Sequence, residues 1–238
     1  MAEQGELNLI GFFPNPHVTL EDKLAAIKSR SWQPDSDDLD AVVRAGKGVP
    51  IEIHGMNSLV GAIIKRARGS IKQLNLLTHA SPEHIGLRGL VRGRTIEFPK
   101  EADATLTFKS IETYRNTPFF YAGAETVEHS DIVGRFAKGA EMVLFACDSG
   151  ATKGGVPDRE FLVAVASMFN VRVVGFLART IYCGETGGPT LQYRVGIGER
   201  DEICANGLGV RDFHRAVARA VKDGRVAFGD PPKQLPKR

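Results

Sequence analysis

The stretch "VPIEIHGMNSLVGAIIKRARGSIKQLNLLTHA", residues 49–80, predicts a strand, a helix and a second strand in succession. It opens with a short apolar run that is bounded by glycine. Residues 57–69 then place Leu59 and Ile63 on one helical face and end at a glycine stop. Residues 71–80 have few polar interruptions, which is typical of a strand covered on both faces. Strands joined through a helix run parallel, so this stretch predicts a parallel sheet.

The same alternation continues towards the C-terminus. Residues 141–150, "EMVLFACDSG", and 171–180, "VRVVGFLART", predict two more core strands with a helix at 157–170 between them. A further strand near an edge is predicted at 189–198, and a helix at 209–224. Alternating strands and helices predict an α/β fold, here a three-layer α/β/α sandwich with a mostly parallel sheet. In such sheets the functional sites form at the carboxyl ends of the strands.

Three segments are predicted along the chain. Residues 1–48 are expected to form an N-terminal helical extension packed on the core, residues 49–224 the α/β domain, and residues 225–238 a frayed basic and proline-rich tail. Residues 85–122 are expected to form short strands or a decorated loop. Residues 125–139, "ETVEHSDIVGRFAKG", are predicted as a helix.

Composition limits the classes of function. The net charge of +3 is too small to imply a nucleic-acid partner. No run of about 18 apolar residues predicts a membrane span, and the N-terminus lacks the pattern of a signal peptide. Three cysteines in 238 residues do not make a disulfide scaffold, so we expect a reducing, cytoplasmic location and at least one free thiol.

Two reactive side chains follow predicted core strands. His79 ends the strand at 71–80, and Cys147 ends the run "VLFAC", so both are expected at the same edge of one sheet. A thiol attacks carbonyl carbon as a thiolate, and an imidazole can take its proton and later protonate the leaving group. The structural alternative is a buried packing cysteine and a histidine that caps its strand.

The segments "NLLTHA" and "VLFACDSG" resemble the paired signatures of the caspase-like cysteine peptidases, the group of caspases, gingipains, legumains and separases. In that family one apolar strand ends in His-Gly and a later strand ends in Ala-Cys. The longer stretch over residues 49–180 is similar to small bacterial caspase-like domains. Ala80 departs from the pattern, because the family usually has glycine there.

The resemblance implies a peptidase that hydrolyses peptide bonds of a protein substrate without a cofactor. Cys147 would be the nucleophile, His79 the general base and acid, and the N–H group of Ala80 part of the oxyanion hole. Alanine resists a positive φ, so a turn that requires one would misform this hole. The alternative is a non-catalytic caspase-like domain that serves as a binding or regulatory module.

Four further residues are candidates for substrate binding. The resemblance implies that the end of the first predicted strand lines the specificity pocket, which indicates His54 and Asn57. Arg179 could face the cleft and favour an acidic substrate side chain, or it could be a solvated loop charge. Asp148 could hold the loop or contact a basic substrate group. For His54 the alternative is a capped histidine at a strand end.

A rival interpretation takes "CDSGATKGG" as a phosphate-binding loop like that of the cysteine phosphatases. Those enzymes need an arginine six positions after the cysteine and a helix directly after it, whereas this chain has Lys153. Cys183 and Cys204 lack the spacing of zinc ligands, so no metal is predicted. The expected partner is a protein or peptide substrate, without nucleic acid or membrane, and the sequence predicts no oligomeric state.

Overall fold

The computed structural model describes residues 7–12, 21, 48–53, 55–78, 80–81, 84–86, 90–91, 94–95, 105–107, 119–122, 125–185, 192–209 and 212–232. Two of the predicted site residues, His54 and His79, lie outside these ranges. Most of the predicted N-terminal extension also lies outside them.

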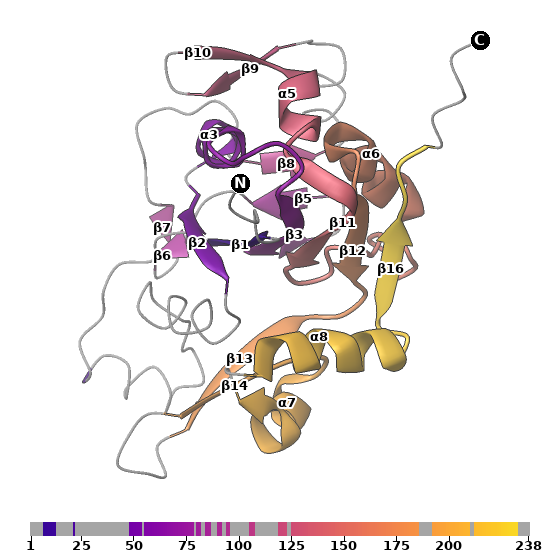
Figure 1. Ribbon diagram of the computed structural model, residues 1–238. Coiled ribbons are helices and arrows are strands. Elements are labelled where there is room, and N and C mark those ends of the chain that lie inside the picture. The colour runs from indigo at the N-terminus through magenta and orange to yellow at the C-terminus, as the bar shows by residue number, and fades with distance from the viewer. Residues whose placement is uncertain are drawn as a thin grey trace.

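A six-stranded sheet forms the centre of the molecule, in the order β16-β12-β11-β3-β1-β2 (Figure 1). The strands are β1 (Leu7–Phe12), β2 (Val49–Glu52), β3 (Ile71–Leu77), β11 (Phe136–Phe145), β12 (Arg172–Phe176) and β16 (Val226–Gly229). Five of them run parallel, and only β16 runs antiparallel to its neighbour β12. The predicted α/β class with a mostly parallel sheet is confirmed.

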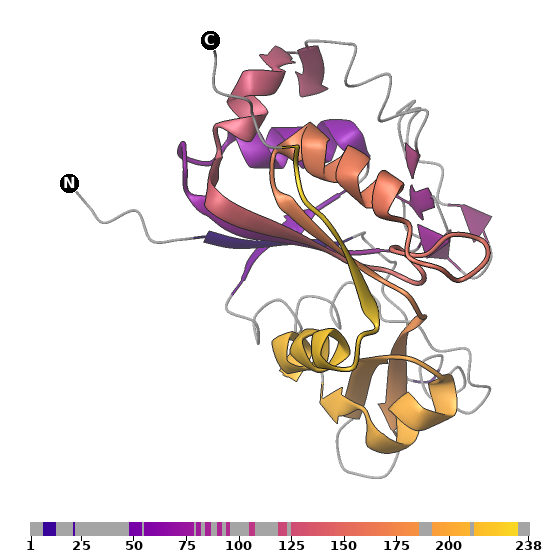
Figure 2. The ribbon, with the colours of Figure 1, turned by 90° about the vertical axis from the view of Figure 1, so that its right-hand side faces the viewer.

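Helices cover both faces of the sheet (Figure 2). On one face lie α3 (Met56–Ile64) and α6 (Arg159–Phe169), with the short helix α5 (His129–Val133) beyond them. On the other face lies α8 (Phe213–Lys222), with α7 (Arg200–Asn206) below it. This arrangement is the predicted three-layer sandwich. Among the described residues no helix is long and apolar enough to cross a membrane.

The remaining strands lie outside the central sheet. A three-stranded antiparallel sheet consists of β13 (Thr180–Glu185), β14 (Gln192–Ile197) and β15 (Leu208–Gly209). The other strands are short: β4 (Ala80–Ser81), β5 (His84–Gly86), β6 (Leu90–Val91), β7 (Arg94–Thr95), β8 (Thr105–Thr107), β9 (Phe119–Ala122) and β10 (Glu125–Glu128). The strand predicted near residues 189–198 therefore exists as β14, but it belongs to the small sheet rather than to the core sheet.

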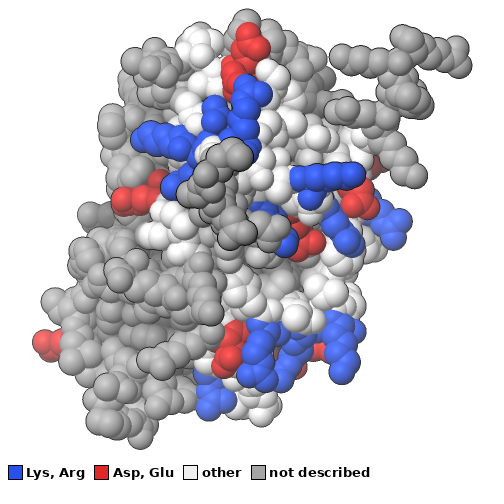
Figure 3. Space-filling view, viewed as in Figure 1, with Lys and Arg blue, Asp and Glu red and all other residues white. Residues whose placement is uncertain are grey.

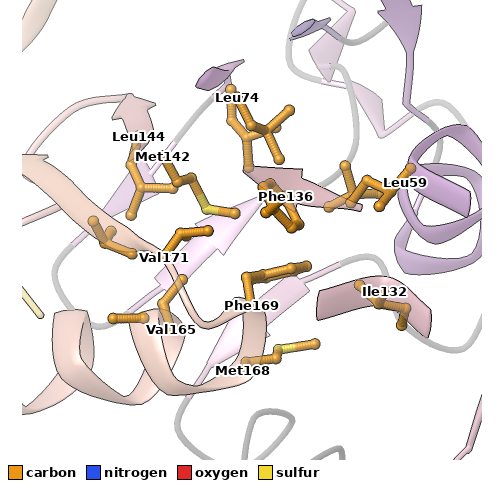
Figure 4. Close-up of a cluster of buried hydrophobic side chains, with 14 of the residues drawn as sticks. Leu59, Leu74, Ile132, Phe136, Met142, Leu144, Val165, Met168, Phe169 and Val171 are labelled. Carbon is orange, nitrogen blue, oxygen red and sulfur yellow. The ribbon is translucent and has the colours of Figure 1, made fainter. Parts of the chain in front are cut away.

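Among the described residues the core forms two clusters, one on each face of the sheet. Successive side chains of a strand point to opposite faces. On β11, Met142 and Leu144 join the cluster beneath α3 and α6, part of which Figure 4 shows. Val143 and Phe145 join the cluster beneath α8 and β14. This two-sided burial explains why residues 142–145 at the end of the strand are apolar without interruption.

The N-terminal strand β1 is an inner strand of the sheet and not part of a separate extension. Leu9 pairs in register with Val49 on one side and with Leu74 on the other, and its side chain is fully buried. The core sheet therefore begins before the boundary expected between residues 48 and 49. The strands predicted on either side of α3 are parallel as expected, but β1 lies between them.

Two further expectations are corrected by the strand pairing. Residues 226–229 were predicted within a frayed tail, but they form β16, and the guanidinium carbon of Arg172 lies 4.2 Å from the centroid of the Phe228 ring. The helix predicted over residues 125–139 is instead β10, the short α5 and the beginning of β11. Gly139, with φ of 76°, lies where the register of β11 against β3 shifts.

Basic and acidic side chains lie beside one another on the face that carries α7 and α8 (Figure 3). Arg225 approaches Glu202 at 3.4 Å, and Arg215 approaches Asp212 at 3.2 Å. Exposed pairs of this kind contribute little to stability. This surface therefore presents both signs of charge in alternation.

Candidate functional site

Cys147 follows the carboxyl end of β11. The last register pair between β3 and β11 joins Leu77 to Phe145, and the N–H of Thr78 donates to the carbonyl of Phe145 at 3.2 Å. β2 lies on one side of β1 and the later strands β3, β11 and β12 lie on the other, so the strand order reverses between β1 and β3. In parallel sheets, ligands bind at the carboxyl edge beside such a switch point. Cys147 is thus placed at the edge where α/β sheets form their sites.

Hydrogen bonds attach the turn after Cys147 to two strands. The buried hydroxyl of Ser149 donates to the carbonyl of Leu144 at 2.7 Å and accepts from the N–H of Phe176 at 3.0 Å. The N–H of Gly150 donates to the carbonyl of Phe176 at 2.9 Å. These bonds join the ends of β11 and β12, so the turn has a defined position.

Glycine is required where this turn packs against β12. A Cβ atom added at Gly175 would lie 2.7 Å from the Cα atom of Gly150, and one added at Gly150 would lie 2.7 Å from the carbonyl carbon of Gly175. The two backbones are therefore in direct contact. This contact brings the turn close enough for the bonds to Phe176.

The Cys147 side chain is half-buried and lies against the start of β13. Its Sγ atom donates to the carbonyl of Thr180 at 3.5 Å and lies 3.6 Å from the Thr180 hydroxyl. Thr180 itself is only 8% exposed. Asp148 has a φ of 52°, a conformation that aspartate tolerates better than most residues, and its N–H donates to the carbonyl of Ala178 at 3.2 Å.

Tyr182 lies two residues further along β13, on the same side of the strand as Thr180. Its ring packs edge-on against Phe145, with centroids 5.8 Å apart. The phenol oxygen is buried and has no hydrogen-bond partner among the described residues. Burial raises the pKa of Tyr182 far above its usual range, and negative charge on Cys147 raises it further.

We expect Tyr182→Phe to keep or slightly increase the free energy of unfolding at pH 7, because a buried hydroxyl without a partner carries a desolvation cost. In the unfolded chain this phenol ionises near pH 10, whereas in the folded protein its raised pKa keeps it protonated. The folded state then binds more protons above pH 10, so wild-type stability falls as the pH rises. Urea unfolding at pH 7 and pH 11 should show a smaller fall for the variant, and an equal fall would contradict this.

The structure describes four of the other predicted site residues. Asp148 directly follows Cys147 in the chain, and Arg179 is exposed and precedes Thr180, which contacts the thiol. Asn57 is half-buried in the first turn of α3, after the carboxyl end of β2. Ala80 begins β4 and pairs with Ile85.

The conformation of Ala80 removes one expected obstacle. Among the described residues other than glycine, only Asp148 and Asn170 have a positive φ. Ala80 therefore has no conformation that would require glycine. The phosphate-loop interpretation lacks its helix, because α6 begins only at Arg159, and Lys153 is exposed.

Cys183 and Cys204 form a disulfide between β13 and α7, and Cys147 is the free thiol. The expectation of at least one free thiol is confirmed by Cys147, whereas the pairing of the other two cysteines was not predicted. Disulfides persist mainly in oxidising compartments, so the pairing removes the argument for a reducing environment. The described residues contain no cluster of three or more His, Cys, Asp and Glu side chains that could hold a metal ion.

We expect the variant Cys183→Ala/Cys204→Ala to lose about 3 kcal/mol of unfolding free energy, because the bridge closes a loop over a sequence separation of 21. Urea unfolding with and without dithiothreitol measures the effect. The wild type should become less stable in reductant, whereas the variant should not respond. A wild-type curve that reductant leaves unchanged would contradict a stabilising bridge.

Thr180 and Tyr182 are site residues that the sequence did not indicate. Their alternate spacing in "TIYC" is the expected pattern of a strand with one buried face, but it carries no chemical signature. Their position against Cys147 depends on the path of the chain from β12 in the central sheet to β13 in the small sheet. Such a contact has no local signal.

Comparison with protein-family models and with curated proteins identifies no relative of this chain. No protein-family model matches the chain, and no curated protein matches it. The functional argument is therefore carried by the fold and by the geometry around Cys147.

Proposed function

We propose that the protein is a cysteine endopeptidase of the caspase-like family, with Cys147 as nucleophile and His79 as general base and acid. One observation carries the proposal: β3 and β11 are adjacent and parallel, and their last register pair is Leu77 with Phe145. His79 and Cys147 each stand two residues further along the chain from these partners. The resemblance implies this same combination of a histidine strand and a later Ala-Cys strand.

The proposed reaction uses the two side chains in turn. The imidazole of His79 takes the thiol proton, and the thiolate of Cys147 attacks the scissile carbonyl carbon to form a tetrahedral oxyanion. As the C–N bond breaks, the imidazolium gives its proton to the departing amine and leaves a thioester. A water molecule, deprotonated by the imidazole, then attacks the thioester and releases the carboxylic acid and the thiol. The N–H of Ala80 is proposed to donate to the oxyanion.

Substrate selection is proposed to involve the residues near this edge. Arg179, which is exposed, would bind an acidic side chain of the substrate, whereas Asp148 would favour a basic one. His54 and Asn57 are proposed to line the pocket from the end of β2. A cleavage profile distinguishes the roles of Arg179 and Asp148, because the first predicts an acidic residue at the cut and the second a basic one.

The test combines a peptide library with a peptide-based thiol electrophile. The wild type should cleave a subset of the library, and mass spectrometry should locate the electrophile on Cys147. A protein that cuts no peptide and reacts with a small alkylating reagent but not with the peptide electrophile would instead support the non-catalytic binding module. This second candidate rests only on the departure of the sequence at position 80 from the family's usual glycine, because the φ of Ala80 is not positive.

A cytoplasmic location, predicted from the cysteine count, belongs with this proposal, and the Cys183–Cys204 bridge is the observation against it. Alkylation of free thiols in intact cells, followed by mass spectrometry, distinguishes the two. Alkylated Cys183 and Cys204 would indicate a reducing compartment, and an intact bridge an oxidising one.

A further inference from the structure

We propose that Thr180 is a positioning residue that holds the Cys147 sulfur in both of its protonation states. The inference rests on the proposed peptidase function and assigns to Thr180 a role in preparing the nucleophile. Thr180 is the first residue of β13, whereas the proposed base, His79, follows β3 in the chain.

Two different groups of Thr180 contact the same sulfur. The Sγ atom of Cys147 lies 3.5 Å from the Thr180 carbonyl oxygen and 3.6 Å from the Thr180 hydroxyl oxygen. Both distances are within the range of hydrogen bonds to sulfur. Because Thr180 is only 8% exposed, few water molecules can replace its hydroxyl as a partner of the sulfur.

The two groups suit opposite charge states. A thiol carries a proton and can donate it to the carbonyl oxygen, which only accepts. Once the proton has moved to a base, the thiolate has nothing to donate and loses this bond. The hydroxyl can then turn its proton toward the sulfur, and a hydrogen bond to a charged acceptor is stronger than one between neutral groups. The sulfur therefore keeps a partner on Thr180 before and after deprotonation.

The position of Thr180 relative to the thiol is set by several contacts. The N–H of Asp148 donates to the carbonyl of Ala178, and the N–H of Gly198 donates to the carbonyl of Arg179 at 2.9 Å. Further along β13, Cys183 is bonded to Cys204 on α7. Thr180 thus lies in a segment that is attached both to the turn after Cys147 and to the small sheet. Its hydroxyl is therefore already beside the sulfur before the thiol loses its proton.

The test measures thiol reactivity and does not require a substrate. The chain has three cysteines, and the other two are joined, so alkylation of the full oxidised chain by iodoacetamide reports on Cys147 alone. Thr180→Val keeps the shape of the side chain and removes the hydroxyl, whereas Thr180→Ser keeps the hydroxyl. We expect Thr180→Val to lower the alkylation rate at pH 7 about tenfold and to move the midpoint of the pH profile upward. Thr180→Ser should restore most of the rate.

The matched control is Thr126→Val, which removes an exposed hydroxyl from β10. This variant should keep the wild-type pH profile, and thermal unfolding should show that all variants are folded. If Thr180→Val does not fold, Thr180→Ala measured against Thr180→Ser carries the same comparison.

Two results would overturn the role of Thr180. One is a pH profile that Thr180→Val leaves unmoved. The other is a shift that Thr180→Ser fails to reverse, because the effect would then come from packing. If the protein cleaves no peptide, the proposed peptidase function is wrong. The pH profile of alkylation still tests the role of Thr180, because it requires no substrate, so the two failures are distinguishable.

Discussion

Cys147→Ala should abolish peptide hydrolysis, with kcat/KM reduced on the order of 10⁶-fold relative to wild type, as expected when a hydrolase loses its nucleophile. No other thiol can replace it, because Cys183 and Cys204 are bonded to each other. The measurement is the cleavage rate of the best peptide from the library profile. The expected loss lies in kcat, because the side chain acts in the bond-making step.

The matched control for this variant is Lys153→Ala, an exposed position in the same loop. It should cleave the peptide at the wild-type rate. Cys147→Ala should also unfold near the wild-type temperature, since its half-buried thiol makes only weak hydrogen bonds. A folded Cys147→Ala variant that still cleaves the peptide would exclude Cys147 as the nucleophile.

Phe145→Ala should lower the free energy of unfolding by about 3–5 kcal/mol, the range expected for removing a buried aromatic side chain. The Phe145 ring is 1% exposed and packs edge-on against three rings. The centroid distances are 4.7 Å to Phe213, 5.4 Å to Phe176 and 5.8 Å to Tyr182. These partners come from α8, β12 and β13, so the cavity would weaken the contact between the sheet and the layer that carries Thr180.

Chemical unfolding of Phe145→Ala, Phe145→Leu and Val156→Ala measures this effect. Phe145→Leu keeps an apolar side chain and should lose less stability than the alanine variant. Val156 is 59% exposed, so its truncation should change the free energy by less than about 0.5 kcal/mol. Equal stability of Phe145→Ala and Val156→Ala would show that the ring cluster does not hold the two layers together.

The core strands that flank the candidate site were predictable from local patterns. The last four residues of β3, β11 and β12 are buried on both faces, so each strand ends in a mostly apolar run before a turn. Helices α3 and α6 were predictable because their apolar residues recur on one face. The parallel arrangement followed from the alternation of these elements.

The strand β1 and the tail strand β16 were missed for one physical reason. Short apolar segments such as "LNLIGF" and "VAFG" become strands only when a neighbouring strand offers its edge. β1 pairs with β2 and β3, which follow it in the chain, and β16 pairs with β12. Neither pairing is visible in a local window.

Residues 125–139 do not form the predicted helix, because strand pairing with β9 and β3 outweighs the local helical pattern. Phe136 pairs with Ile71 of β3 and lies against Phe169 of α6, with ring centroids 6.2 Å apart. A residue held by both a strand and a helix from elsewhere is placed by tertiary contacts rather than by its own propensity.

The sequence by itself determined the α/β class, the parallel core and the position of Cys147 after a buried strand, because hydrophobic periodicity is a property of neighbouring residues. Only the tertiary structure decided the strand order, the Cys183–Cys204 bridge and the contact of the thiol with Thr180. These features join residues far apart in the chain, and their formation depends on which surfaces the folded chain buries together.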